Sequence, residues 1–270
     1  MILTSEEIER YSRQIILNEI GYEGQEKLSK GKVLVIGAGG LGSPASMYLT
    51  AAGVGTIGIA DGDIVSLSNL QRQVIHNESG LGKKKTDSAK SFLNSLNSNV
   101  NIITYDKFLD ETNIIDIIKE YDFIIDASDK IENKFLINDA CVIAKKPYVH
   151  GAILQFEGQL MTYVPGKSPC YRCVFEDVPD EKVLSCSQAG IIGMMSGIVG
   201  TLQALEAVKY ILNMGELLTG RMLIINGLKM QFRIVKLSSP NNTCRVCSKN
   251  ADIKDLSWMS ELRRNTKDNK

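Results

Sequence analysis

The sequence lacks three features that would assign a chain to a class at once. Its 31 Lys and Arg residues balance 31 Asp and Glu residues, so no general charge draws it to nucleic acid or to an anionic membrane. It lacks an uninterrupted apolar run of the roughly 18–20 residues that a bilayer requires, because Gln203, Glu206 and Lys209 interrupt the longest one. Its first residues lack the basic and apolar regions of an export signal. We therefore expect a cytoplasmic protein without a membrane or nucleic-acid partner.

Histidine is also scarce, since only His76 and His150 occur, and neither has companions for a metal site or a catalytic triad. Cysteine is better represented, with six residues in the chain. In a reducing compartment these cysteines are expected to be metal ligands or reactive thiols rather than disulfides.

Apolar segments alternate with helical segments over the first part of the chain. This alternation indicates βαβ units and a mainly parallel, Rossmann-like, doubly wound α/β sheet. After Gly158 this alternation of strands and helices ends. The later strands are expected to extend the sheet in antiparallel fashion, and a long helix is expected at Ala189–Leu212 between them. Residues 1–250 are predicted to form a single domain, and residues 251–270 a polar, poorly ordered tail. The predicted strands are 32–36, 56–60, 101–105, 122–125, 147–153, 159–164, 222–225 and 232–235.

A glycine-rich segment follows the first predicted strand and opens the helix after it. Gly37, Gly39 and Gly42 fit the pattern G-x-G-x-x-G, in which glycine lets the backbone turn tightly and approach phosphates at a helix N-terminus. Asp61 ends the next strand, 19 residues past Gly42, where a carboxylate can bind ribose hydroxyls. The pattern predicts an adenine-nucleotide site, and by itself it fits an NAD enzyme and an ATP enzyme equally.

Charged segments near the nucleotide end of the predicted sheet favour ATP. Residues 68–73 and 82–85 bring several cations there, and residues 126–129 add carboxylates at the end of the fourth strand. Triphosphate chemistry needs both, because cations neutralise phosphate oxygens and a carboxylate holds Mg²⁺. An NAD-dependent oxidoreductase would instead need a nicotinamide pocket and a partner for hydride transfer.

Four cysteines form two pairs with metal-ligand spacing. Cys170 and Cys173 make one C-x-x-C pair, and Cys244 and Cys247 make another about seventy residues later. Each pair can supply one edge of a tetrahedral zinc site, and a metal with four thiolate ligands is structural. The spacing predicts a zinc ion that clips the C-terminal strand to the segment after the sheet.

The other two cysteines have different settings. Cys186 follows an acidic segment and precedes the long helix, whose N-terminus would lower the pKa of a nearby thiol and favour the nucleophilic thiolate. We expect it to be reactive, the alternative being an inert loop cysteine. Cys141 lies in an apolar helical segment and is expected to be a core residue.

Several ordered segments together resemble the ThiF/MoeB/HesA family of bacterial relatives of ubiquitin-activating enzymes, over about residues 5–247. The resemblance implies ATP-dependent adenylylation of the C-terminal Gly-Gly carboxylate of a small ubiquitin-like sulfur-carrier protein of the thiamin or molybdopterin type. The carboxylate attacks the α-phosphate, which gives an acyl adenylate and pyrophosphate. The segments that carry the resemblance are residues 10–14, 37–42, 61–63, 68–72, Lys85, 156–159, 170–173 and 200–207.

The resemblance also implies roles for particular residues. Arg13 looks like the residue that reaches the nucleotide across the two-fold interface of a homodimer, and Asp129 like the magnesium ligand. Cys186 matches the family cysteine that bonds to the activated carrier as a thioester or acyl persulfide. With Arg13, Arg72, Lys85, Asp129 and Cys186 as the predicted catalytic set, the predicted nucleotide site contains Gly37, Gly39, Gly40, Asp61, Asp63, Ser68, Asn69, Gln71, Arg72, Lys85, Asp129 and Lys130.

The chain departs from the family pattern after the magnesium carboxylate. Relatives usually have Asn directly after that Asp and Arg four residues beyond the Asn, whereas this chain has Lys130 and Lys134. Lys130 either pairs with Asp129 or contacts phosphate. Because few residues follow Cys247, no rhodanese-like domain is expected, and the sulfur donor would be a separate protein such as a cysteine desulfurase.

Three alternatives stay open at this stage. The chain could activate a different carboxylate, such as a peptide or a tRNA-linked group. From another class, an NAD-dependent oxidoreductase would share the glycine loop and Asp61 but leave Arg13, Arg72, Lys85 and Asp129 unexplained. A non-catalytic scaffold that only binds the carrier would be compatible with Lys130 and Lys134.

Overall fold

A computed structural model describes residues 3–179, 189–238 and 240–268 of the chain. Eight strands form one sheet in the order β3-β2-β1-β4-β5-β6-β7-β8. The first five run parallel, and β6, β7 and β8 extend the sheet antiparallel. This confirms the predicted fold class. The strands are β1 (Lys32–Ile36), β2 (Thr56–Ala60), β3 (Asn101–Tyr105), β4 (Phe123–Asp126), β5 (Tyr148–Leu154), β6 (Glu157–Tyr163), β7 (Arg221–Asn226) and β8 (Gln231–Lys236).

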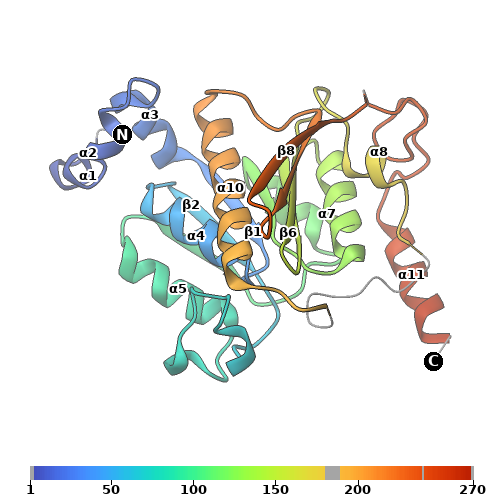
Figure 1. The fold of residues 1–270 in the computed structure, drawn as a ribbon, viewed down its shortest axis with the longest axis horizontal. Coiled ribbons are helices and arrows are strands. Elements are labelled where there is room, and N and C mark those ends of the chain that lie inside the picture. The colour runs from blue at the N-terminus through green and yellow to red at the C-terminus, as the bar shows by residue number, and fades with distance from the viewer. Residues whose placement is uncertain (1–2, 180–188, 239, 269–270) are drawn as a thin grey trace.

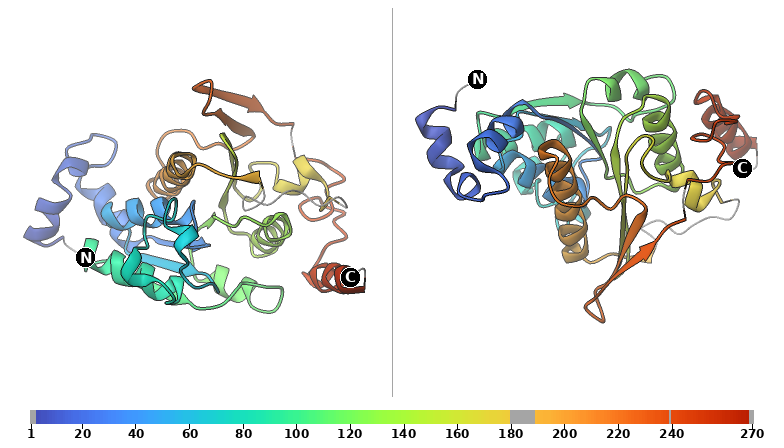
Figure 2. Two further views of the ribbon diagram at one scale, coloured as in Figure 1. Left: turned by 60° about the horizontal axis from the view of Figure 1, so that its bottom comes forward. Right: turned by 90° about the horizontal axis from the view of Figure 1, so that it is seen from above.

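Helices cover both faces of the parallel part of the sheet (Figures 1 and 2). The described helices are α1 (Ser5–Arg10), α2 (Ser12–Ile15), α3 (Gly21–Lys30), α4 (Gly42–Ala51), α5 (Lys85–Leu96), α6 (Ile114–Lys119), α7 (Ile131–Ile143), α8 (Tyr171–Phe175), α10 (Gly193–Leu212) and α11 (Ser257–Asp268). Two short 3-10 helices, η1 (Leu67–Asn69) and η2 (Glu78–Gly80), lie between β2 and α5.

Side chains alternate along β1 between two separate cores, as the period of a strand requires. Val33 and Val35 pack in the core that includes buried residues of α4, α5 and α10, whereas Leu34 and Ile36 pack in the core beneath α6 and α7. Every residue from Val33 to Ile36 is buried, which explains why this strand reads as a continuous apolar run. Burial on both faces makes the sheet a rigid platform for the loops at its ends.

The C-terminal segment differs from the sequence expectation. Residues 257–268 form the helix α11 rather than a poorly ordered tail. Ile253, Leu256 and Met259 are buried against the core beneath α6 and α7, and Ser260 Oγ donates a hydrogen bond of 2.6 Å to Glu111. Trp258 and Leu262 of α11 pack against the same core as Met259, so this largely polar helix is docked on the domain by its apolar residues. Helix α11 lies at the opposite end of the molecule from α1 and α2 (Figure 1).

Candidate active site

The glycine loop connects β1 to the N-terminus of α4. Gly37 has a positive φ of 107°, and a Cβ atom there would lie 2.7 Å from the carbonyl oxygen of Ala127. A Cβ atom on Gly42 would lie 1.8 Å from the carbonyl oxygen of Gly37. Only glycine fits these two positions, so the loop passes close to the end of β4, and its residues Gly39 and Gly40 are partly exposed before α4 begins. Such a turn into a helix is a phosphate-binding geometry.

Two carboxylates and a lysine lie beside this loop. Asp61, which is 7% exposed, accepts hydrogen bonds of 2.8 Å from the amides of Ala38 and Asp63. Lys85 Nζ lies 2.8 Å from Asp63 Oδ2 and 3.9 Å from Asp61 Oδ2, and the residue is only 6% exposed. Each Asp61 oxygen keeps a second lone pair, which leaves the carboxylate able to accept from ribose hydroxyls.

His76 supports the loop in a way that sequence reasoning missed. Its Nε2 atom lies 3.0 Å from the carbonyl oxygen of Ala38, and its Nδ1 atom lies 3.0 Å from Ser88 Oγ. Burial, together with the charge of Lys85, lowers the pKa of His76 below its usual value, although the bond to Ala38 opposes this. A neutral imidazole that donates from Nε2 to Ala38 therefore holds the loop. In the sequence, the only indication of this role was that His76 lies close to residues 68–73 of the predicted nucleotide site.

The segment after β2 brings Arg72 to the same place. Asn69 Oδ1 accepts from the Ser66 amide at 3.1 Å, which closes the 3-10 turn η1. Arg72 Nη1 donates to the Ser68 carbonyl oxygen at 3.0 Å, and Arg72 Cγ lies 3.5 Å from where a Cβ atom on Gly40 would be. The Gln71 carbonyl oxygen in turn lies close to Gly193 at the start of α10.

The loop after β4 lies against the glycine loop, because the backbone of Ala127 and Ser128 contacts Gly37. Asp129 and Lys130 are exposed at the start of α7, and no ion pair among the described residues joins them. Lys134 has a different position: it is buried, and its Nζ atom donates to the carbonyl oxygen of Ser128 at 2.7 Å. Of the two departures from the family pattern, only Lys130 therefore has its side chain at the surface.

Within one chain, Arg13 does not lie with the predicted nucleotide-binding residues. It is exposed on α2, and the neighbouring Gln14 side chain donates to the carbonyl oxygen of Ala52 at 3.1 Å and to Gln25 at 2.8 Å. Ala52 follows the last residue of α4, whereas the glycine loop precedes the first, and a helix of that length spans about 15 Å. Arg13 therefore lies at the other end of α4 from the glycine loop of its own chain.

The four cysteines with metal-ligand spacing are gathered into one cluster. All four Sγ atoms lie within 4.8 Å of one another. The separations are 3.6 Å between Cys170 and Cys244, 3.4 Å between Cys173 and Cys247, and 3.9 Å between Cys170 and Cys173. Four thiolates at the usual Zn–S distance would be about 3.8 Å apart in a tetrahedron, so the cluster is compatible with zinc. It joins α8 to the segment that follows β8.

The remaining cysteines are Cys141 and Cys186. Cys141 is fully buried in α7, which confirms its prediction as a core residue, and burial raises the pKa of its thiol well above the usual value. Cys186 lies at residues 180–188, outside the described part of the chain.

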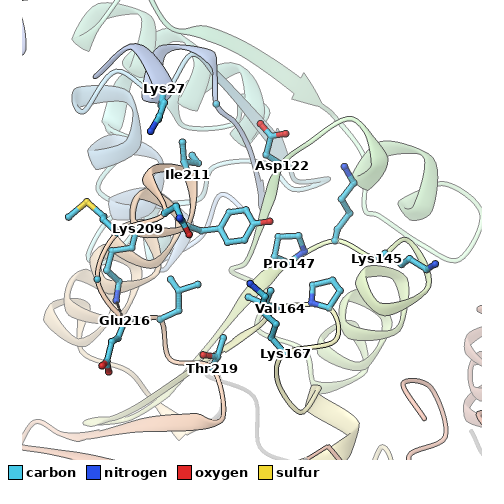
Figure 3. A pocket seen from close by; sticks show the side chains of 18 of the residues that line it. Lys27, Asp122, Lys145, Pro147, Val164, Lys167, Lys209, Ile211, Glu216 and Thr219 are labelled. Carbon is cyan, nitrogen blue, oxygen red and sulfur yellow. Dashed lines mark hydrogen bonds between the residues drawn. The ribbon is translucent and has the colours of Figure 1, made fainter. Parts of the chain in front are cut away.

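The large open cavity of the described residues lies elsewhere. It has a volume of about 1270 Å³ and is bordered by Gly31, Asp122 and Pro147, which precede β1, β4 and β5. It is thus at the amino ends of the strands, opposite the glycine loop. Its rim carries Lys27, Lys30, Lys145, Lys146, Lys167, Lys209 and Arg221, several of which are visible in Figure 3.

In the part of the chain that the structure covers, no helix has the length and apolar character to cross a membrane.

Comparisons with known proteins identify relatives over most of the chain. The model of the ThiF family matches residues 11–246. The chain is 48% identical over 255 residues to "Adenylyltransferase and sulfurtransferase MOCS3" of Culex quinquefasciatus, which covers 94% of this chain and 58% of that protein. It is 44% identical over 250 residues to "Adenylyltransferase and sulfurtransferase MOCS3-1" of Zea mays, covering 92% and 53%. The chain therefore spans a little over half the length of the curated relatives it matches.

Among solved structures, the chain is similar to E. coli MccB in a crystal structure with ATP. The TM-score is 0.78 at 25% identity, and the match covers 88% of this chain and 74% of that one. Because the family model matches most of the chain, this protein belongs to the ThiF family.

Proposed function

We propose that this chain adenylylates the C-terminal Gly-Gly carboxylate of a small ubiquitin-like sulfur-carrier protein of the thiamin or molybdopterin type. The observation that carries the proposal is the gathering of Lys85 and Arg72 around the glycine loop, beside the loop that holds Asp129. An NAD site has no need of this concentration of cations. The relatives named adenylyltransferase and sulfurtransferase, at 44–48% identity, support the same reaction.

In the proposed reaction, a carboxylate oxygen of the carrier attacks the α-phosphorus of ATP. The bond from that phosphorus to the bridging oxygen of the β-phosphate breaks, and pyrophosphate leaves with the electron pair. The amides of the glycine loop before α4 and the cations Lys85 and Arg72 would stabilise the charge on the phosphates, while Asp61 would hold the ribose. Since these groups are already in place, little reorganisation is needed during the reaction.

Magnesium fits the donor set at the end of β4. Mg²⁺ is usually held by one or two protein carboxylates together with substrate phosphates and water. Asp129 is exposed and follows Ala127 and Ser128, whose backbone lies against the glycine loop. When bound, the ion supplies charge neutralisation at the phosphates. The neighbouring Lys130, which has no ion pair with Asp129, would contact phosphate.

A homodimer would give Arg13 its role. Two exposed apolar residues, Ile16 and Leu17, lie just after Arg13 and suit a protein interface. Arg13 would then reach the nucleotide of the partner subunit, since it lies far from the glycine loop of its own chain. Mixing Arg13→Ala subunits with Arg72→Ala subunits should restore activity, because some mixed dimers regain one intact site. Verified mixed dimers without any recovery would contradict this role.

The apolar surface of the β7–β8 hairpin supports the proposal that the substrate is a protein. Leu228, Met230, Phe232 and Ile234 are each more than half exposed, and the hairpin projects from the rest of the sheet (Figure 2). Large exposed apolar side chains on one element are typical of a docking surface. An ubiquitin-like carrier bound there is the partner we propose for it.

Cys186 is the proposed acceptor for onward transfer. The acyl adenylate would be attacked by its thiolate, with release of AMP, to form a thiol-cleavable adduct with the carrier. Mass measurement should detect this adduct in the wild type and not in Cys186→Ala, which should still exchange pyrophosphate. An adduct that persists in the variant would place the nucleophile elsewhere.

None of the five described cysteines is proposed as the sulfur donor. Cys141 is fully buried, and the remaining four form the cluster proposed to hold structural zinc. The sulfur donor that we propose is a separate protein, such as a cysteine desulfurase, in the cytoplasm.

Pyrophosphate exchange tests the proposed function. With a Gly-Gly-ending carrier and Mg²⁺, the protein should exchange labelled pyrophosphate into ATP. Asp129→Ala should lower the rate by about 10³-fold and keep the fold, because unshielded phosphate charge raises the barrier. Wild-type exchange in that variant would remove Asp129 from the site. Tight nicotinamide-cofactor binding without any exchange would favour an oxidoreductase instead.

A further inference from the structure

Lys134 contacts the backbone beside the proposed magnesium ligand. It lies in the first turns of α7, five residues after Asp129, and is only 5% exposed. Its Nζ atom donates to the carbonyl oxygens of Ser128 at 2.7 Å and Gly151 at 2.8 Å, and lies 3.4 Å from Asp126 Oδ2. An ammonium group has three donors, and these three oxygens occupy all of them.

A buried network compensates the charge of this lysine. Asp126 is fully buried and accepts from Ser128 Oγ at 2.6 Å and from His150 Nδ1 at 3.0 Å. Burial alone would raise the pKa of Asp126, but Lys134 and the hydrogen bonds lower it to about 2. Gln203 Nε2 donates to the Asp126 backbone carbonyl at 2.7 Å. The ammonium and the carboxylate thus form a satisfied buried pair, whose disruption is costly.

This network restricts the backbone that leads to Asp129. The carbonyl of Ser128, which Lys134 holds, belongs to the peptide bond directly before Asp129. On the other side, the Ala127 carbonyl lies so close to Gly37 that no Cβ atom fits between them. Asp129 itself is exposed and has no ion pair among the described residues. Its location therefore depends on the backbone, which is held between the glycine loop and Lys134.

We propose that Lys134 is a positioning residue, which holds the Ser128 peptide so that the Asp129 carboxylate faces the nucleotide phosphates. The inference rests on the proposed ATP and magnesium site. Lys134 does not itself bind phosphate, since its three donors are used within the protein. By contrast, a lysine whose side chain was exposed at this position would act by attracting the phosphate charge directly.

Binding of the non-hydrolysable analogue α,β-methylene ATP tests this role without any carrier. Its affinity would be measured by calorimetry on the full chain, with and without Mg²⁺. We expect Lys134→Met to leave the metal-free affinity within about twofold of wild type and to weaken the enhancement by Mg²⁺ about tenfold. Lys134→Arg, which keeps charge and donors, should recover most of that enhancement. Lys119→Met, at an exposed lysine of α6, is the matched control and should change neither affinity.

The two affinities distinguish positioning from a general loss of structure. A structural defect would weaken metal-free and metal-dependent binding alike, and that result in a folded Lys134→Met protein would overturn the proposal, as would an unchanged Mg²⁺ effect. If Lys134→Met does not fold, Lys134→Gln, which keeps one amide donor group, serves with the same criteria. Failure of the proposed function would look different: the Mg²⁺ effect on the analogue would follow Lys134 while no carrier supported pyrophosphate exchange.

Discussion

The two ends of the parallel sheet both carry lysines, but the lysines are held in different ways. At the carboxyl ends, Lys85 and Lys134 are at least 94% buried, and their ammonium groups contact oxygens of Asp63 and of the Ser128 and Gly151 backbone. At the amino ends, Lys27, Lys30, Lys145 and Lys167 are exposed around a much larger opening.

On the proposed function, ATP binds at the carboxyl ends of the strands and not in the larger opening at their amino ends. Exposed lysines are screened by water and cost little to place, so they are poor evidence of a site. Several of those around the cavity also lie near the C-terminal ends of α3, α7 and α10, where cations offset the helix dipoles. In the proposed site, Lys85 is the buried and oriented cation that would stabilise charge on the phosphates, whereas Lys134 would hold the backbone beside Asp129.

The largest effect among the following predictions is expected for a substitution of Lys85, and its absence would remove the difference between the two ends of the sheet. Lys85→Met should lower pyrophosphate exchange by about 10²–10³-fold, because a preorganised cation next to the phosphates is lost. Lys167→Met, at an exposed lysine of the cavity rim, should stay within about twofold of wild type. Pyrophosphate-exchange rates at saturating ATP measure the effect of each substitution, and circular dichroism checks that each variant is folded. Equal losses in both variants would erase the distinction between the two ends.

A smaller effect is expected when the cysteine cluster is broken. Cys244→Ser should release one zinc ion per chain and cost about 4 kcal/mol, because the metal joins α8 to the segment after β8. That cost corresponds to a fall of about 10 °C in melting temperature. Metal analysis and thermal unfolding measure both quantities, and nucleotide affinity of the folded fraction should be unchanged. Zinc-free protein with full thermal stability would refute the structural role.

The smallest effect is a dependence of stability on pH that comes from the buried histidines. Burial lowers the pKa values of both His76 and His150. The unfolded chain therefore binds more protons as the pH falls below about 6.5, and the free energy of unfolding decreases. Together they can remove at most about 2.5 kcal/mol between pH 7 and pH 5.5. Asp126 contributes no slope in this window, since its pKa is lowered to about 2.

Urea unfolding at several pH values, with the zinc content checked at each, measures this slope. His76→Asn should reduce it, because one of the two buried imidazoles is removed. A wild-type free energy of unfolding that does not change between pH 7 and pH 5.5 would show that the histidines are not held neutral.

Sequence reasoning predicted most of the fold because strong local patterns coincide with the elements. The segment 33–36 is buried on both faces and therefore reads as an apolar run, and Gly37 and Gly42 are required by backbone contacts of less than 3 Å. The cysteine pairs were predictable for a similar reason, since ligand spacing is a local property. The glycine loop, Asp61 and the cysteine cluster could therefore be anticipated.

What could not be predicted depends on partners far apart in the chain. His76 and Lys134 contact backbone carbonyl oxygens of Ala38, Ser128 and Gly151, and a carbonyl group has no sequence signature. Helix α11 was missed because its polar residues outnumber the apolar Trp258, Met259 and Leu262, which pack on the domain. The position of Arg13 at the far end of α4 likewise follows from packing and not from its own segment.

The most direct test of the central claim is to map where ATP binds. Photocrosslinking with 8-azido-ATP, followed by mass spectrometry of the digested protein, identifies the peptides next to the adenine. The account predicts labelled peptides that contain residues 37–42 or 61–73, at the carboxyl ends of β1 and β2, with labelling suppressed by excess ATP. Labelling confined to peptides of the lysine-rimmed cavity, such as residues 145–167 or 209–221, would contradict it.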